Sequence, residues 1–325
     1  MQLLLKFIRS AGCALLAFVG LSIIGSTAAI ADWPNRGIRL VVPFPPGGAP
    51  DALARLVADH LSASLSQKVV VENKPGAGGA IAGTQVARSA PDGYTLMLAG
   101  LSTHIINPLT NPLVSFDPMN DFTHIAFIGG PAMVLVSTPS TNIRTIQEFL
   151  REARAGTITS YTTLGPGTIG HLLMENVCVT NGLKLTAIPF TQVPVAEIIT
   201  GRVPVGAFAW SAVSSQVKAG TINAFAIGAH SRIADYPEVL TLKEQGIDLS
   251  PSTWVSLAAP AGLDPAITQR LNKLVRDFVN LPEVQDRFAR DASDIKQLDP
   301  EGMVALYKSE TAAWQSIATS VNFRQ

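Results

Sequence analysis

At 325 residues the chain is long enough to hold two domains of ordinary size. Its 24 basic and 24 acidic residues balance, so the sequence offers no basic surface for nucleic acid and no charge block for a membrane surface.

The first 31 residues have the pattern of a secretory signal peptide. Lys6 and Arg9 form a basic start, residues 11–24 an apolar stretch, and residues 29–31 a small-x-small cleavage site. The apolar stretch is shorter than a usual membrane span, so a retained anchor is disfavoured. Cleavage removes two basic residues and no acidic one, which leaves 22 basic against 24 acidic residues and a net charge of −2. Cys178 is then the one remaining cysteine, so we expect a soluble exported protein without an internal disulfide.

The clearest local signal lies between residues 38 and 59. Apolar residues 38–42 predict a buried strand, a loop with three prolines and two glycines follows, and Asp51 opens a helix with apolar residues at helical spacing. Several N–H groups at a helix N-terminus lack partners within the helix and the dipole there is positive, so an anion is favoured. Because the loop contains no Lys or Arg, backbone N–H groups would hold that anion. The alternative is a plain connection, as most such turns in α/β folds are.

Strands and helices then alternate. A strand at residues 69–71, a glycine-rich loop at 72–79, a helix at 80–90 and a strand at 94–98 predict a βαβαβ unit with a parallel sheet. The loop matches a dinucleotide-binding pattern only in part, and tight turning and close packing explain its glycines better.

Polar residues follow the strand at 94–98. Ser102, Thr103 and His104 lie at its carboxyl end, where open α/β sheets place their ligands. Their hydroxyl groups and imidazole would contact a bound anion. Alternatively, the hydroxyl groups cap the turn and His104 hydrogen-bonds to the backbone.

A second anion-binding loop is predicted further along the chain. A strand at residues 157–161 leads into a Gly/Pro loop with threonines at 162–171, and a helix at 172–179 follows. Two such loops on separate α/β units are more informative than one. If the units face each other, both positive helix ends point into one cleft.

The remaining elements complete two lobes. We expect strands at residues 125–129, 133–137, 185–189, 203–208, 223–228 and 254–259, and helices at 146–155, 195–200, 214–219, 242–245, 264–280, 283–291 and 300–320. The last helix should pack onto the first lobe. The chain crosses between the lobes near residues 130–132 and 253–257, an arrangement that permits hinge closure around a ligand.

Several long stretches resemble one family. They are WPNRGIRLVVPFPPGGAPD (33–51), VVVENKPGAGGAIAG (69–83), ARSAPDGYTLML (87–98), THIINP (103–108) and GPGTIGHL (165–172). With the signal peptide and the lobe order, they resemble the Bug receptors, the extracytoplasmic solute-binding proteins of tripartite tricarboxylate transporters. The resemblance covers essentially the whole mature chain. It implies an α/β, two-lobed periplasmic-binding-protein fold (type II-like, Venus flytrap) with a mainly parallel sheet in each lobe, and a periplasmic receptor without catalysis.

The resemblance also implies the domain limits and the ligand site. After a signal peptide at 1–31, lobe 1 comprises residues 32–131 and 256–325, and lobe 2 comprises residues 132–255. Family members hold a ligand carboxylate by backbone amides and ordered waters from two loops. The matching positions are Phe44, Pro45, Gly47, Gly48 and Asp51 in lobe 1, Thr163, Gly167, Thr168, Ile169 and Gly170 in lobe 2, and Ser102, Thr103 and His104 in a third loop.

Three departures from the family pattern bear on the ligand. Pro50 replaces a usual Thr or Ser, residues 189–192 lack a usual Tyr and Lys, and Phe208 stands where many members have an Asp. An Asp would pair with an ammonium group, so its absence weighs against amino acids. Phe208, Trp210 and Phe190 would favour an aromatic or apolar acid, unless the strand register is shifted or these rings belong to the core.

An enzyme is the main alternative, and the sequence supports it little. It has no nucleophile elbow, no Walker loop and no paired-histidine zinc motif, and its five histidines show no metal-ligand spacing. We expect no catalysis, no cofactor and no metal site. The expected partners of this monomer are a small carboxylate and the membrane subunits of a transporter. A receptor that presents its liganded form to a membrane sensor is the alternative, because its lobes would look the same.

Overall fold

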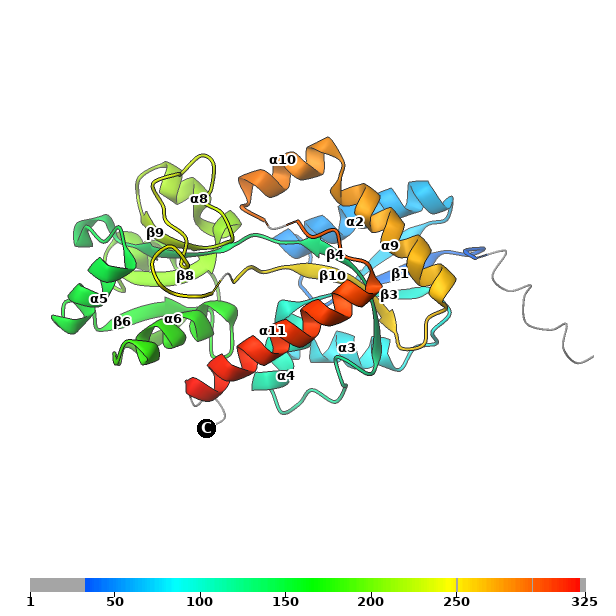
Figure 1. The fold of residues 1–325 in the computed structure, drawn as a ribbon, viewed down its shortest axis with the longest axis horizontal. Coiled ribbons are helices and arrows are strands. Elements are labelled where there is room, and N and C mark those ends of the chain that lie inside the picture. Colours follow the sequence, from blue (N-terminus) through cyan, green and yellow to red (C-terminus); the bar gives the residue numbers. More distant parts are fainter. Residues whose placement is uncertain (1–32, 250, 294, 322–325) are drawn as a thin grey trace, which may run out of the picture.

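The computed structural model describes residues 33–249, 251–293 and 295–321, so the predicted signal peptide lies outside the described residues. Figure 1 shows two lobes joined by extended strands, each lobe built on a five-stranded sheet with helices around it. The strand order is β2-β1-β3-β10-β4 in lobe 1 and β7-β6-β8-β5-β9 in lobe 2.

Both sheets follow one plan. Four described strands of each sheet run in the same direction, and the fifth, β10 in lobe 1 and β5 in lobe 2, runs antiparallel to both of its neighbours. This matches the expected mainly parallel α/β fold. The lobe 1 strands are β1 (Ile38–Val42), β2 (Val69–Asn73), β3 (Thr95–Gly100), β4 (Phe122–Gly129) and β10 (Val255–Pro260), and the lobe 2 strands are β5 (Met133–Ser137), β6 (Ser160–Thr163), β7 (Thr186–Pro189), β8 (Val205–Ala209) and β9 (Asn223–Gly228).

Apolar faces of the helices cover both sides of the sheets. Side chains at their first turns fix several helix starts: Thr145 and Glu148 form a capping box, and Asp264 and Asp299 cap two later helices. The helices are α2 (Ala49–Leu65), α3 (Ala80–Ala87), α4 (Asn107–Thr110), α5 (Ile146–Arg154), α6 (Ile169–Thr180), α7 (Val195–Ile199), α8 (Trp210–Lys218), α9 (Pro265–Val279), α10 (Pro282–Arg290) and α11 (Pro300–Ser320), with short 3-10 turns at Ala77–Gly79 and Pro139–Thr141 and a π-helical turn at Ser102–Ile106.

The chain crosses between the lobes along two adjacent segments. One links β4 to β5, and the other leads into β10. They touch through their backbones, because a Cβ atom on Gly130 would lie 2.4 Å from the carbonyl oxygen of Thr253. Gly100, at the end of β3, lies equally close to the second segment: a Cβ atom there would be 2.4 Å from the carbonyl oxygen of Trp254. A side chain at either glycine would force these strands apart.

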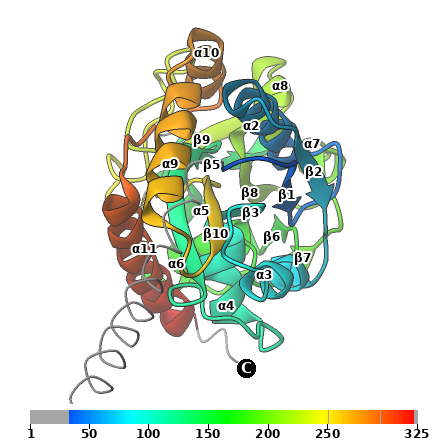
Figure 2. The same cartoon turned by 90° about the vertical axis from the view of Figure 1, so that its right-hand side faces the viewer.

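The last helix, α11, contacts both lobes. It packs against β4 and the π-helical turn of lobe 1 and against α6 of lobe 2. Its buried residues Met303, Tyr307 and Trp314 join one apolar cluster with residues of both lobes. Figure 1 shows α11 running across the two lobes, and Figure 2 places it beside α9. The expectation that this helix packs onto the first lobe was therefore incomplete.

Several other predicted elements differ from the structure. α6 and β4 begin three residues earlier than predicted and α8 begins four residues earlier. The strand expected at residues 157–161 is β6 at Ser160–Thr163, so it extends into the glycine loop. The helix expected at 242–245 is a series of turns, in which the carboxylate of Glu244 accepts hydrogen bonds from the Thr241 backbone N–H and from Arg232.

A buried histidine pair lies between the lobe 1 sheet and α11. His104 is fully buried, and His124 stacks on Tyr307 with ring centroids 3.8 Å apart. His124 Nε2 lies 2.9 Å from the Pro118 carbonyl oxygen, which makes Nε2 the protonated nitrogen. Burial lowers the pKa of His104 well below its ordinary value and lowers that of His124 to about 4.

This pair predicts a loss of stability in acid. In the unfolded chain His124 takes up its proton near pH 6.5, whereas in the fold it does so near pH 4. Its neutral form therefore stabilises the fold fully above pH 6.5, and that contribution is lost as the pH falls toward 4. We expect up to about 3 kcal/mol of pH-dependent unfolding free energy from His124, which His124→Gln removes. Denaturant unfolding of both proteins from pH 7.5 to 4 measures this, and parallel curves would contradict it.

Candidate ligand-binding cleft

A cleft of about 690 Å³ lies between the lobes. None of the described residues that line it has a charged side chain. Both predicted loops contribute, together with the glycine loop before α3 and the start of α4. The lining residues are Pro43, Phe44, Pro45, Pro75, Gly76, Gly78, Gly79, Ser102, Ile106, Asn107, Thr110, Asn111, Met133, Leu164, Pro166, Gly167, Thr168, Ile169, Gly170, Ala207, Phe208, Ala209 and Thr253.

The first predicted loop ends at α2, which begins two residues earlier than predicted. Gly48 is its N-cap and Ala49 its first residue, and no side chain caps it. Asp51 therefore does not open the helix but lies in its first turn. The N–H groups of this turn have no partners within the helix, and Pro50 has no N–H at all. Gly48 and Ala49 are exposed at this end.

Asp51 holds the loop in shape. Its buried carboxylate accepts hydrogen bonds from the Gly47 backbone N–H at 2.9 Å, Arg55 Nε at 3.0 Å and Asn73 Nδ2 at 2.8 Å. Asn73 Nδ2 also donates to the carbonyl oxygen of Phe44 at 3.1 Å. Chiefly the Arg55 hydrogen bond, then those from Gly47 and Asn73, lower the Asp51 pKa to about 2, so Asp51 is ionised at neutral pH. Asp51 is not among the residues that line the cleft.

The second predicted loop folds around two threonine hydroxyl groups. Thr168 is the N-cap of α6, and its Oγ1 accepts a 3.4 Å hydrogen bond from the His171 backbone N–H. Thr163 Oγ1 and Thr168 Oγ1 both donate to the Gly165 carbonyl oxygen, at 3.2 and 2.9 Å. Thr163 is therefore a buried support of the loop outside the cleft lining, whereas Thr168 is part of that lining.

Two glycines of this loop have different functions. Gly167 has a φ of +75°, which favours glycine, and its N–H donates to His171 Nδ1 at 3.3 Å. Gly170 allows close packing, because a Cβ there would lie 2.3 Å from the carbonyl oxygen of Ala207 on β8. Its small size brings the α6 N-terminus against the lobe 2 sheet.

The third predicted loop divides between the cleft and the core. Ser102 lines the cleft, Thr103 lines only a smaller chamber that adjoins it, and His104 lines neither. His104 Nδ1 lies 2.9 Å from Thr103 Oγ1, and its ring contacts Phe122 at a centroid distance of 4.5 Å. The structure thus places His104 in the aromatic core of lobe 1 and not in the cleft.

Phe208 lies at the floor of the cleft but presents almost no surface to it. Only 2 % of the residue is exposed, and its ring packs in the core beside Val134 and Trp210. Trp210 is equally buried, and its Nε1 donates to the Arg290 carbonyl oxygen at 2.9 Å. Of the two interpretations that the sequence left open, the structure supports rings of the core.

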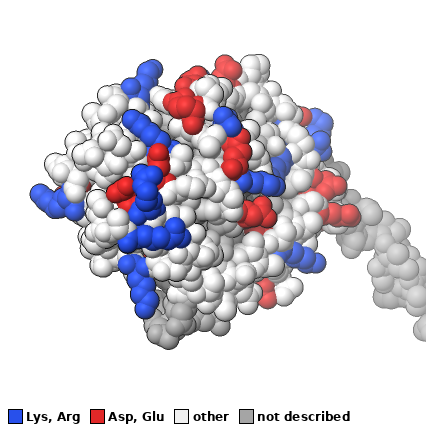
Figure 3. Space-filling view, turned by 60° about the vertical axis from the view of Figure 1, so that its left-hand side comes forward, with Lys and Arg blue, Asp and Glu red and all other residues white. Residues whose placement is uncertain are grey.

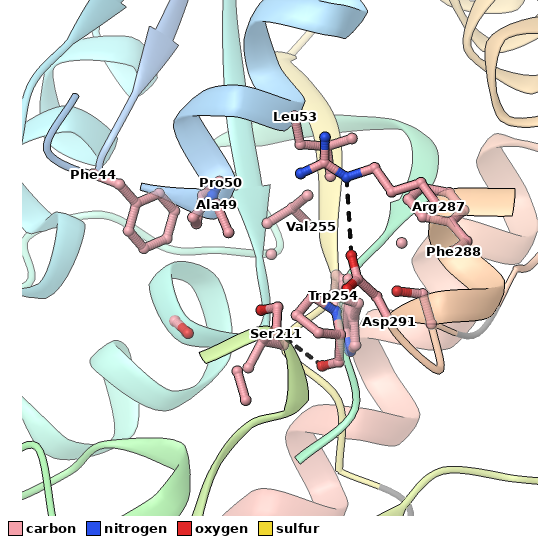
Figure 4. Close-up of a pocket in the computed structure, with 18 of the residues that line it drawn as sticks. Phe44, Ala49, Pro50, Leu53, Ser211, Trp254, Val255, Arg287, Phe288 and Asp291 are labelled. Atoms are coloured by element: carbon pink, nitrogen blue, oxygen red, sulfur yellow. Dashed lines mark hydrogen bonds and ion pairs between the residues drawn. The ribbon is translucent and has the colours of Figure 1, made fainter. Parts of the chain in front are cut away.

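A smaller chamber of about 210 Å³ adjoins the cleft, with Phe44, Ser102, Ala209 and Thr253 lining both. Figure 4 shows its walls: Phe44, Ala49 and Pro50 near the start of α2, Arg287, Phe288 and Asp291 on and after α10, and Val255 between them. Sequence patterns did not predict this chamber, because its walls come from distant parts of the chain. The glycines at 76–79 were also assigned only to packing, yet Gly76, Gly78 and Gly79 line the cleft.

Charged residues lie elsewhere on the molecule. Figure 3 shows basic and acidic side chains interspersed over one face, with uncharged surface between them. Among the described residues, no three His, Cys, Asp or Glu side chains gather in a way that could hold a metal ion. No helix within the described ranges is long and apolar enough to cross a membrane.

Two α/β lobes, two crossing segments and a cleft between glycine-rich loops define a solute-binding protein. The sequence model for the tripartite tricarboxylate transporter family receptor, TctC, matches residues 53–323. The chain therefore belongs to this family of receptors.

Individual relatives agree with this assignment. Protein BugT of Bordetella pertussis is 30 % identical over 315 residues, which cover 93 % of this chain and 96 % of that protein. A solved structure of an R. palustris protein with adipate has a TM-score of 0.78 at 28 % identity, covering 90 % of this chain and 99 % of the other. The structure of MatC from Rhodopseudomonas palustris with bound malate has a TM-score of 0.74 at 26 % identity, covering 88 % of this chain and 99 % of the other. These similarities confirm the predicted family and fold, and a receptor rather than an enzyme.

The Asp51 network predicts a specific defect. Asp51→Asn replaces an ionised acceptor of three hydrogen bonds with a neutral amide, and we expect a loss of about 1–3 kcal/mol in unfolding free energy. The ionised carboxylate stabilises the fold fully above its unfolded pKa of 3.8, and this is lost as the pH falls toward 2. The difference should therefore be present at pH 7 in denaturant unfolding. Asp59→Asn, at an exposed position of the same helix, is the control. Equal losses in both variants would refute the assignment.

Proposed function

We propose that this protein captures a small carboxylate in the periplasm, in the cleft between its lobes, and delivers it as a monomer to a tripartite tricarboxylate-type transporter. The observation that supports this most directly is a cleft without charged side chains, lined by the loop that leads into α2 and by the first turn of α6, with the first residues of α2 in the adjoining chamber. Such a site offers backbone N–H groups and helix dipoles to an anion. The relatives solved with adipate and malate agree with a carboxylate ligand.

The proposed ligand contacts follow from the loops. In lobe 1 they are the backbone at Phe44 and Pro45, which line the cleft, and at Gly47 and Gly48, which follow them in the same loop outside the lining, with Asp51 acting through the loop that it shapes. In lobe 2 they are Gly167, Thr168, Ile169 and Gly170, with Ser102 from the third loop. Thr163 and His104 act behind these contacts, because they line neither the cleft nor the chamber, and Thr103 lines the chamber alone.

We further propose a preference for acids with an apolar or aromatic body over amino acids. No carboxylate lines the cleft itself, and Asp291 in the adjoining chamber is already paired with Arg287, so neither space offers a free partner to an ammonium group. Apolar side chains such as Phe44, Leu164 and Ile169 line it instead. This preference no longer depends on Phe208, whose ring lies in the core.

A thermal-shift screen of the purified protein tests the function. A ligand that binds only the folded state stabilises it by about 2.7 kcal/mol at one hundred times Kd, which raises Tm. We expect shifts with monocarboxylates and dicarboxylates, and none with the corresponding alcohols or amides. Shifts with amino acids alone would contradict the proposed preference. If no acid raises Tm, even after the protein has been unfolded and refolded to remove any bound ligand, the proposed function is contradicted.

The backbone cradle makes a second prediction. Gly48 has an ordinary φ of −79°, and the nearest atom to a Cβ there would be 3.7 Å away, so Gly48→Leu should fold normally. Its side chain would stand at the mouth of α2 and block the N–H groups there. We expect at least tenfold weaker acid binding by calorimetry with little change in Tm. Ala63→Leu, exposed near the other end of α2, is the control and should bind as the parent does. Unchanged affinity of Gly48→Leu would remove α2 from the site.

Delivery is separable from capture. Deletion of the gene should abolish cellular uptake of the acid that binds, if the receptor serves a transporter. Normal uptake with a lost transcriptional response to that acid would instead identify a sensor partner.

A further inference from the structure

The chamber beside the cleft is large enough for part of a ligand. Its volume is about 210 Å³, and an engineered apolar cavity of about 150 Å³ is known to bind benzene. The shared lining residues Phe44, Ser102, Ala209 and Thr253 make it continuous with the cleft. A molecule whose carboxylate lies between the two loops would therefore have a second space to fill.

The chamber wall is mainly apolar. Leu53, Pro50, Val255 and Phe288 contribute hydrocarbon surface, and Figure 4 shows these side chains around one space. Its charged residues, Arg287 and Asp291, form an ion pair at 3.9 Å on the α10 side. The chamber therefore offers little net charge to a ligand.

Two buried polar atoms in this wall lack partners. Trp254 is 3 % exposed, and its Nε1 has no hydrogen-bond partner among the described residues. Ser293 Oγ is also a buried atom without a hydrogen-bond partner among the described residues. Unpartnered buried polar groups are rare in folded proteins, because each costs the free energy of its lost hydration. Both residues belong to the chamber wall, so a polar group of a ligand body, or water, is the partner that we expect for them.

We propose that the chamber is a subsite for the uncharged body of the ligand, a ring or short hydrocarbon chain whose carboxylate stays between the α2 and α6 loops. This inference rests on the proposed function and adds where the body binds. A second carboxylate is disfavoured, because Arg287 is already paired and Asp291 would repel it. Ala209 and Ser211 come from lobe 2 and Leu53 and Phe288 from lobe 1, so a body in the chamber contacts both lobes.

A series of acids tests the subsite. Acetate, butyrate, hexanoate and 3-phenylpropionate share one carboxylate and differ in their apolar bodies. We expect Kd, measured by calorimetry, to fall about fourfold per added methylene group until the chamber is filled. Adipate has the chain length of hexanoate with a second carboxylate, and it should bind more weakly than hexanoate.

A variant that fills the chamber provides the second test. Ser211 is exposed on the first turn of α8 and lines the chamber but not the cleft, so Ser211→Trp should fold. It should remove the gain from longer bodies, bringing butyrate and hexanoate close to acetate, while acetate, which has no body to place in the chamber, binds as to the parent. Ala212→Trp, on the next exposed residue of α8 and outside both linings, is the matched control and should keep the full series.

The outcomes separate this inference from the proposed function. If acids bind but affinity does not depend on chain length, the subsite is wrong and the cradle stands. Tighter binding of adipate than of hexanoate would also overturn it, since the chamber would then take an anion through Arg287. A Ser211→Trp protein that keeps the gain from longer bodies overturns it as well. If no acid binds, the proposed function and the subsite both fail.

Discussion

The structure depends on the direct backbone contact between the two segments that join the lobes. Gly130 of one segment lies against Thr253 of the other with no room for a side chain, and Gly100 at the end of β3 lies equally close to Trp254. The same segments supply the reversed strand of each sheet, β5 in lobe 2 and β10 in lobe 1. The connection is therefore continuous with both cores. With α11 packed on both lobes, this contact fixes which faces of the lobes meet and where the cleft lies.

The cleft separates the charge that shapes it from the ligand that it is proposed to bind. Asp51 and Arg55 neutralise each other behind the α2 loop, so the loop is held by an ionised group that does not line the cleft. The α6 loop is also held in shape, but by uncharged groups: the hydroxyl groups of Thr163 and Thr168 donate hydrogen bonds to the Gly165 carbonyl oxygen. What both loops can offer a ligand is backbone N–H groups and apolar surface. Small acids differ mainly in their bodies, so discrimination among them has to come from the walls.

Local patterns predicted much of this arrangement, and contacts between distant residues account for what they missed. Strands, glycine loops and the family followed from contiguous residues. Asp51 was taken for a helix cap, although Pro50, just inside the helix, is the better signal for a start two residues earlier. His104 has a chemistry suited to a ligand site, but Phe116 and Phe122 enclose it in the core. The chamber, and the packing of α11 against both lobes, bring together segments that are far apart in the sequence. The periodicity of apolar residues within one segment cannot predict such contacts.

A cleft without formal charge also has a consequence for the medium in which the protein works. Attraction between charged side chains and an anion weakens as salt rises, because counter-ions screen it within about 8–10 Å at physiological ionic strength. In the proposed binding mode the attraction is left to short-range N–H contacts and to buried hydrocarbon, which salt affects little. An exported receptor meets external ionic strengths that its cell does not control. The price of such tolerance is the loss of electrostatic steering, so capture proceeds at the ordinary rate of diffusion and docking.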